Sequence, residues 1–186
     1  LLIGGNNVGK STICEALDLV LGPDRLNRTP PVEEFDFRNA NYLAADGETA
    51  APLRIEAVLI ELTDTIKSLC AANLEFWHKT EKRLLAEGEI AVADNPNVEL
   101  CLRLVTIARY DIDEDQFVAR TVYGRTNEEP DEEPKAIPLR VKRAIGFLYL
   151  RTIRTGSRAL SLERGTLLDN ILRMKGARKG MWENIR

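Results

Sequence analysis

GGNNVGKS, residues 4–11, follows the apolar segment LLI (residues 1–3) and precedes an amphipathic stretch that continues to Leu21. Gly4 to Ser11 fits the pattern G-x-x-x-x-G-K-[ST], a phosphate-binding loop (P-loop) that joins a strand to a helix. Residues 1–3 are expected to be the end of a buried strand and Ser11–Leu21 a helix. Because every position and the strand–turn–helix frame match, the sequence favours a P-loop over an ordinary glycine-rich connection.

The two glycines of this loop allow backbone conformations that are closed to residues with a side chain. Gly4 and Gly9 are therefore expected to turn the chain tightly. The backbone N–H groups of residues 7–12 would then point inward as an anion-binding nest. The first turn of the helix adds its unpaired N–H groups and the positive end of its dipole.

The side chains that end the loop supply the remaining contacts to a nucleoside triphosphate. Lys10 is predicted to contact the β- and γ-phosphates, and is the candidate catalytic residue. Ser11 is predicted to bind the Mg²⁺ ion that bridges those phosphates, and Thr12 to contact the α-phosphate. The full predicted ATP-binding set is Gly4, Asn6, Asn7, Val8, Gly9, Lys10, Ser11 and Thr12.

Length and composition indicate one globular domain with a substantial core. The 186 residues are 44% hydrophobic and 30% charged, with a net charge of −3, which excludes a generally basic nucleic-acid binder. No apolar run approaches the roughly 18–20 residues of a membrane helix, and no signal peptide is recognised. Three widely spaced cysteines fit reduced thiols in a cytoplasmic protein. Because the sequence opens at the P-loop without Met, we expect it to be a piece of a longer protein.

Hydrophobic periodicity predicts the elements that follow the first helix. Strands are expected at residues 53–62, 98–108, 117–123 and 146–150. The second and third of these should form an antiparallel hairpin around the acidic bend 111–115. Helices are expected at 64–85, 139–145 and 160–174, and surface connections at 24–52 and 127–134.

A P-loop enzyme also needs an acidic residue at the end of a second apolar strand, the Walker B position. Glu61 and Asp64 follow such a strand. The alternative, which we favour, is an ordinary strand whose exit leads into a helix with Thr63 or Asp64 as its N-cap. The single histidine, His78, is expected in a helix, and a zinc site there would lack further ligands.

The doubled asparagine Asn6-Asn7 within the P-loop resembles the ATP-binding-cassette type, found in SMC- and RecF-like DNA-repair ATPases and in OLD (overcoming lysogenisation defect) ATP-dependent endonucleases. Among these families, the doubled asparagine favours the OLD endonucleases. Other stretches are also similar to OLD sequences; they are residues 32–37, 54–59, 147–151 and 160–169. The P-loop is the only specific part of this resemblance.

The resemblance implies an α/β fold: an incomplete P-loop NTPase head of the ABC/SMC/RecF type with a partly antiparallel β subdomain. The P-loop would span 4–12, the β-rich subdomain about 53–150 and a helical end about 158–186, all within one partial ATPase head (1–186). It further implies a Toprim nuclease domain downstream, for which these residues leave no room. ATP and Mg²⁺ would be the cofactors, and the head would form a homodimer or larger homo-oligomer without membrane contact.

Two parts of a cassette ATPase are not recognisable. The only glutamine, Gln116, adjoins the acidic bend rather than the loop in which such enzymes place a Mg²⁺-contacting glutamine. Residues 160–165 superficially suggest the signature motif that reaches a partner's γ-phosphate. Since no Walker B strand follows them, we interpret them as an ordinary helix and expect the fragment to be inactive alone.

The last third of the chain is locally basic; its cations are Arg151, Arg154, Arg158, Arg164, Arg173, Lys175, Arg178 and Lys179. Such clusters supply sequence-independent affinity for DNA phosphates. Arg151 and Arg154 are the candidate DNA contacts, and a solvated helix face balanced by acids is the alternative.

The leading hypothesis is thus the ATPase domain of an OLD-like endonuclease, in which ATP gates DNA cleavage elsewhere in the protein. A RecF- or SMC-like DNA-repair head without a nuclease is the second. A small kinase or GTPase with Glu61 or Asp64 as Walker B is the third, although no Asn-Lys-x-Asp motif of a GTPase is present.

Overall fold

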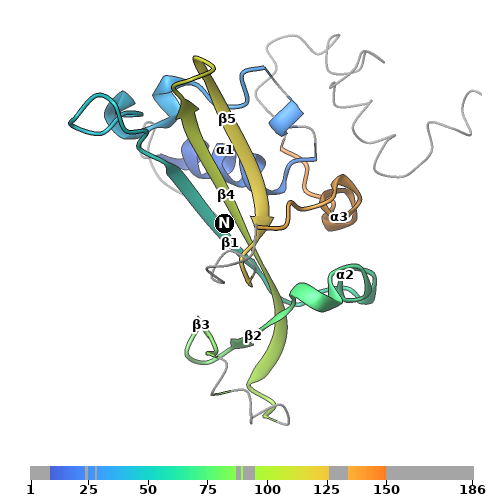
Figure 1. The fold of residues 1–186 in the computed structure, drawn as a ribbon. Helices are drawn as coiled ribbons and strands as arrows, with labels where there is room; N and C mark the ends of the chain where they lie inside the picture. Colours follow the sequence, from blue (N-terminus) through green and yellow to red (C-terminus); the bar gives the residue numbers. More distant parts are fainter. Residues whose placement is uncertain are drawn as a thin grey trace, which may run out of the picture.

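The computed structural model describes residues 9–23, 25–27, 29–86, 89, 95–125 and 134–149. Within them, helices cover a curled antiparallel sheet (Figure 1). The predicted strand 1–3, the predicted loop 127–134 except for its last residue, and the predicted helix 160–174 lie outside the described residues, as does the expected helical end at 158–186.

Helix α1 (Lys10–Leu21) confirms the predicted first helix and begins one residue earlier. It ends at Gly22, whose N–H donates to Asp18 C=O over 2.8 Å. Leu19, Val20 and Leu21 are buried at this end. The amphipathic pattern predicts more burial in the first turn of the helix than the structure shows, because Ile13 is 47% exposed.

The connection predicted over residues 24–52 contains three short 3-10 helices among its described residues. They are Arg25–Asn27, Glu34–Asp36 and Arg38–Ala40. Val32 and Phe37 are buried against Leu19 and Ala108, which fixes the connection on the sheet. Phe37 and Tyr42 also pack with Phe117.

The sheet is organised around β4 (Val98–Asp111), which pairs with β1 (Leu53–Leu59), β5 (Gln116–Tyr123) and β2 (Glu75–His78). A short β3 (Arg83–Leu84) pairs with β2. All these pairings are antiparallel. The predicted β4–β5 hairpin is therefore confirmed, with β4 extending to Asp111, whereas β1 ends at Leu59 instead of residue 62.

The predicted helix over 64–85 is wrong beyond its first turns. Helix α2 spans only Asp64–Leu69, a 3-10 turn covers Ala71–Asn73, and the chain then enters β2 and β3. Phe76 and Trp77 pair with Leu100 and Glu99 of β4. Aromatic residues favour a pleated surface, and the unpaired end of β4 supplies the partner that the helical spacing ignored.

The predicted strand 146–150 is also wrong over its described residues. Helix α3 (Leu139–Ile145) is confirmed and ends at Gly146, which adopts the left-handed conformation (φ 73°) of a helix cap. Residues 147–149 are irregular, and Phe147 packs against the core. In this segment an apolar side chain packs against the core without its backbone pairing with a strand.

One face of the sheet carries the main core. Leu102 and Leu104 of β4 are fully buried together with Val20 of α1 and Val141 of α3, and Ile66 and Cys70 from the α2 region join them. Figure 1 shows α1 crossing behind β4 and β5. The opposite face of the β4–β5 hairpin is therefore the one turned away from α1.

Candidate functional site

The structure describes the second half of the predicted P-loop. Gly9 has φ 83° and ψ 8°, the left-handed conformation expected of it, and is the N-cap of α1. Lys10 is the first helical residue and is half-buried, while Ser11 and Thr12 are exposed. Gly4, Asn6, Asn7 and Val8 lie outside the described residues.

The start of α1 has no side-chain cap and no acidic residue in its first turn. Its first intrahelical hydrogen bond runs from Ile13 N–H to Gly9 C=O over 3.1 Å. The N–H groups of Ser11 and Thr12 therefore precede the helical ladder. A helix start of this kind, with a lysine in its first turn, suits an anion such as a phosphate.

The two Walker B candidates occupy the bend after β1. Glu61 is exposed with φ 54°, and Asp64 is the exposed first residue of α2, 3.8 Å from Lys67 Nζ. Thr63 is the N-cap of α2, its hydroxyl accepting a hydrogen bond from Ile66 N–H over 3.4 Å. This confirms the predicted capping role at this strand exit and supports the ordinary-strand interpretation.

The single histidine has a local structural role. His78 lies in β2 rather than in the predicted helix, and its Nδ1 accepts a hydrogen bond from Glu81 N–H over 3.1 Å. Among the described residues, no three His, Cys, Asp or Glu side chains gather as a metal site. Gln116, the first residue of β5, pairs with Asp111 beside the acidic bend, as its sequence setting indicated.

All three cysteines are free thiols. Cys70 and Cys101 are buried, and burial raises the pKa of the Cys101 thiol to about 12. The pKa of Cys70 is raised for the same reason. Neither buried thiol is therefore suited to act as a nucleophile.

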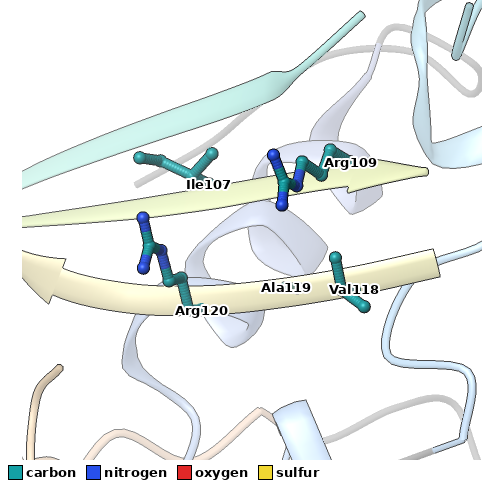
Figure 2. Close-up of a pocket in the computed structure, with 5 residues that line it drawn as sticks. All are labelled: Ile107, Arg109, Val118, Ala119 and Arg120. Carbon is teal, nitrogen blue, oxygen red and sulfur yellow. The ribbon is translucent and has the colours of Figure 1, made fainter. Parts of the chain in front are cut away.

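Sequence patterns missed a basic hollow on the hairpin. Ile107 and Arg109 of β4 and Val118, Ala119 and Arg120 of β5 line a depression of about 240 Å³ (Figure 2). Both arginines are exposed. The usable signal was the predicted pairing of strands 98–108 and 117–123: Arg120 lies inside the second, Arg109 directly follows the first, and period-two alternation puts them on one face once the first strand is extended. Arg151 and Arg154, the residues chosen from the sequence, lie outside the described part.

Comparisons of this chain with protein-family models, with curated proteins and with solved structures gave no match. Among the described residues, no helix combines the length and the apolar character needed to cross a membrane.

Proposed function

We propose that this chain binds Mg²⁺-ATP through residues 4–12. The supporting observation is the start of α1: a left-handed Gly9 in the sequence frame of a P-loop, followed directly by Lys10 and Ser11. Each of these positions has a defined contact to the triphosphate. Gly9 shapes the turn, Lys10 neutralises the β- and γ-phosphates, and Ser11 places a hydroxyl on the metal ion.

We further propose that this chain is the head of an OLD-like, ATP-dependent DNA endonuclease that is cytoplasmic and homo-oligomeric. It has the α/β fold of an ABC/SMC/RecF-type P-loop NTPase with an antiparallel subdomain. ATP binding would gate cleavage by a Toprim domain outside this sequence. Support comes from Asn6-Asn7 in the P-loop and from the similar stretches further along. The antiparallel β1–β4–β5 arrangement beside α1 agrees with such a subdomain.

The second candidate is a RecF- or SMC-like head without a nuclease. The same P-loop and subdomain favour it equally. Flanking coding sequence separates the two, since a carboxylate-bearing nuclease domain supports the first and a long coiled coil the second. A kinase or GTPase using Glu61 or Asp64 is less well supported, because Thr63 uses this strand exit as a helix cap.

Calorimetric titration with Mg²⁺-ATP tests the phosphate assignment. Lys10→Ala is expected to abolish binding while the circular dichroism spectrum stays unchanged. Lys67→Ala removes the same charge from the exposed surface of α2 and serves as the matched control. ATP binding that survives Lys10→Ala with wild-type affinity would contradict the proposal.

Ser11→Ala tests the metal contact separately. It should reduce the affinity for Mg²⁺-ATP more than the affinity for ATP in the presence of EDTA, because only the first uses the hydroxyl–metal bond. Steady-state hydrolysis of Mg²⁺-ATP by the unaltered chain tests whether its ATP site is complete. Brisk multiple turnover would contradict an incomplete site and favour the kinase or GTPase alternative.

A further inference from the structure

We propose that the outer face of the β4–β5 hairpin binds the phosphate backbone of double-stranded DNA through Arg109 and Arg120. This surface is distinct from the C-terminal arginines chosen from the sequence. It rests on the proposed function only for the choice of DNA as the polyanion.

The strand register puts both arginines on one face. Arg109 pairs with Val118 and Ile107 pairs with Arg120, so the four side chains project together. Ala108, between Ile107 and Arg109, belongs to the buried cluster on the other face. Figure 2 shows α1 behind the hairpin and the two arginine side chains on the near side.

The two guanidinium groups are diagonal neighbours, and within the described part of the chain neither has an ion pair or a hydrogen bond. Two other arginines, Arg103 and Arg83, differ in this respect. Arg103 is held by Glu75 at 2.9 Å, and Arg83 by Glu89 at 2.8 Å. Two positive charges on diagonally neighbouring residues repel each other when no anionic group lies beside them. An anion bound between them removes that repulsion.

The floor between the arginines is apolar. Ile107 and Val118 line the hollow there and are half-buried. A guanidinium–phosphate contact is stronger beside such a surface than in bulk water. Arginine also matches the geometry of a phosphate with paired donors.

The shape of the surface favours a long polyanion over a small one. Both arginines are exposed on an open sheet face, which cannot surround a free phosphate. Arg54 of β1 pairs with Ile107, so Arg54, Ile107 and Arg120 form one row across three strands. Glu56 partly balances Arg54 at 3.1 Å.

The acidic bend limits the surface on one side. Asp113, Glu114 and Asp115 lie at the tip of the hairpin, just beyond Arg109. They repel a phosphate backbone, and the chain as a whole is negative. DNA is therefore expected to cross the strands over Arg109, Arg120 and Arg54 rather than to follow the hairpin toward its tip.

Fluorescence anisotropy with a labelled 20-base-pair duplex tests the proposal. Arg109→Ala/Arg120→Ala should weaken binding about tenfold and reduce the slope of log K against log salt by about two, one for each lost phosphate contact. Arg38→Ala/Arg140→Ala is the matched control. It removes the same charge from exposed positions outside the hairpin, in the 3-10 helix Arg38–Ala40 and in α3.

Equal weakening by the two double variants would mean that net charge alone is measured, and would overturn the proposal. No salt-dependent binding by the unaltered protein would overturn it as well. Displacement of the duplex by millimolar inorganic phosphate, but not by chloride at equal ionic strength, would indicate a small-anion site instead. Stronger competition by duplex RNA or by anionic lipid vesicles than by unlabelled DNA would assign the face to that partner.

Lys10→Ala separates this inference from the proposed function. It is expected to abolish ATP binding and to leave the anisotropy titration unchanged. If ATP binding survives that substitution, the nucleotide assignment fails while the arginine comparison stands. If ATP binding is lost but the Arg109/Arg120 variant binds DNA normally, only the hairpin assignment fails.

Discussion

Lys142 donates a hydrogen bond from its buried Nζ to Thr121 Oγ1 over 3.1 Å, which ties α3 to the core face of β5. Thr121 Oγ1 in turn lies 2.8 Å from Thr106 Oγ1 on the paired strand β4. The lysine is only 4% exposed. Burial lowers its pKa from 10.5 to about 8, and the carboxylate of Asp18 opposes that shift.

Lys142 should make the unfolding free energy rise with pH in the alkaline range. Between pH 8 and 10.5 the unfolded chain holds this proton and the folded chain does not, so raising the pH favours the folded state. Below that window both states are protonated and the effect is constant. The full effect is on the order of 3 kcal/mol, by conversion of the pKa difference.

Lys142→Met isolates this effect in urea denaturation at pH 7.0 and 9.5. The unfolding free energy of the unaltered protein, relative to the variant, should increase by roughly 2 kcal/mol between the two pH values. Taking the difference is necessary because Tyr123 and Cys101, both with a pKa raised to about 12, destabilise the folded state at high pH. A pH-independent difference would show that Lys142 titrates normally.

The Arg103–Glu75 pair should contribute strongly to stability. Arg103 donates to both carboxylate oxygens of Glu75 at 3.0 and 2.9 Å, and their side chains are 6% and 15% exposed. Glu75→Gln removes the nearer carboxylate charge from this buried guanidinium, with Glu56 standing farther off at 4.0 Å, and should cost about 3 kcal/mol in urea denaturation.

Glu89→Gln is the control, since it breaks a similar bidentate contact to Arg83 at an exposed position. Solvent screens that pair, so its loss should change the urea midpoint far less. Similar losses in the two variants would refute the role assigned to burial.

Gly9→Ala should affect both stability and nucleotide binding. No atom of the described residues lies within 4 Å of a Cβ placed at Gly9, so the cost is conformational, about 1–2 kcal/mol for a left-handed residue. Gly47→Ala is matched, because Gly47 has φ 70° and equally open surroundings. Thermal denaturation should report similar losses for both, whereas calorimetry should show weaker ATP binding only for Gly9→Ala. Equal ATP affinities would argue against a P-loop.

Thr63→Ala should destabilise α2 by about 0.5–1 kcal/mol, because the Ile66 N–H loses its side-chain acceptor. Thr65→Ala, at an exposed position inside the same helix, should be neutral or slightly stabilising, since alanine is the better helix former. Chemical denaturation distinguishes the two. A larger loss from Thr65→Ala would contradict the cap.

Local chemistry allowed several features to be predicted without coordinates. The left-handed Gly9, the cap at Thr63 and the β4–β5 hairpin depend on residues close together in the chain. The predictions that were wrong concern segments whose conformation depends on residues far away in the chain. The segment 75–85 satisfies a helical spacing, yet pairing of Glu75–His78 with β4 decides its conformation. Tertiary pairing overrides propensity in such short apolar runs.

The candidate site also combines features that the sequence predicted with features that only the structure showed. Sequence alone supplied the prediction that residues 4–12 bind phosphate, because the residues of that motif lie in one continuous turn. Only the tertiary structure decided which arginines are available. Arg103 is neutralised by Glu75, 28 residues away, whereas Arg109 and Arg120 come together through strand register. Charge compensation and a shared face are properties of contacts between distant segments, and the order of residues in the chain does not contain them.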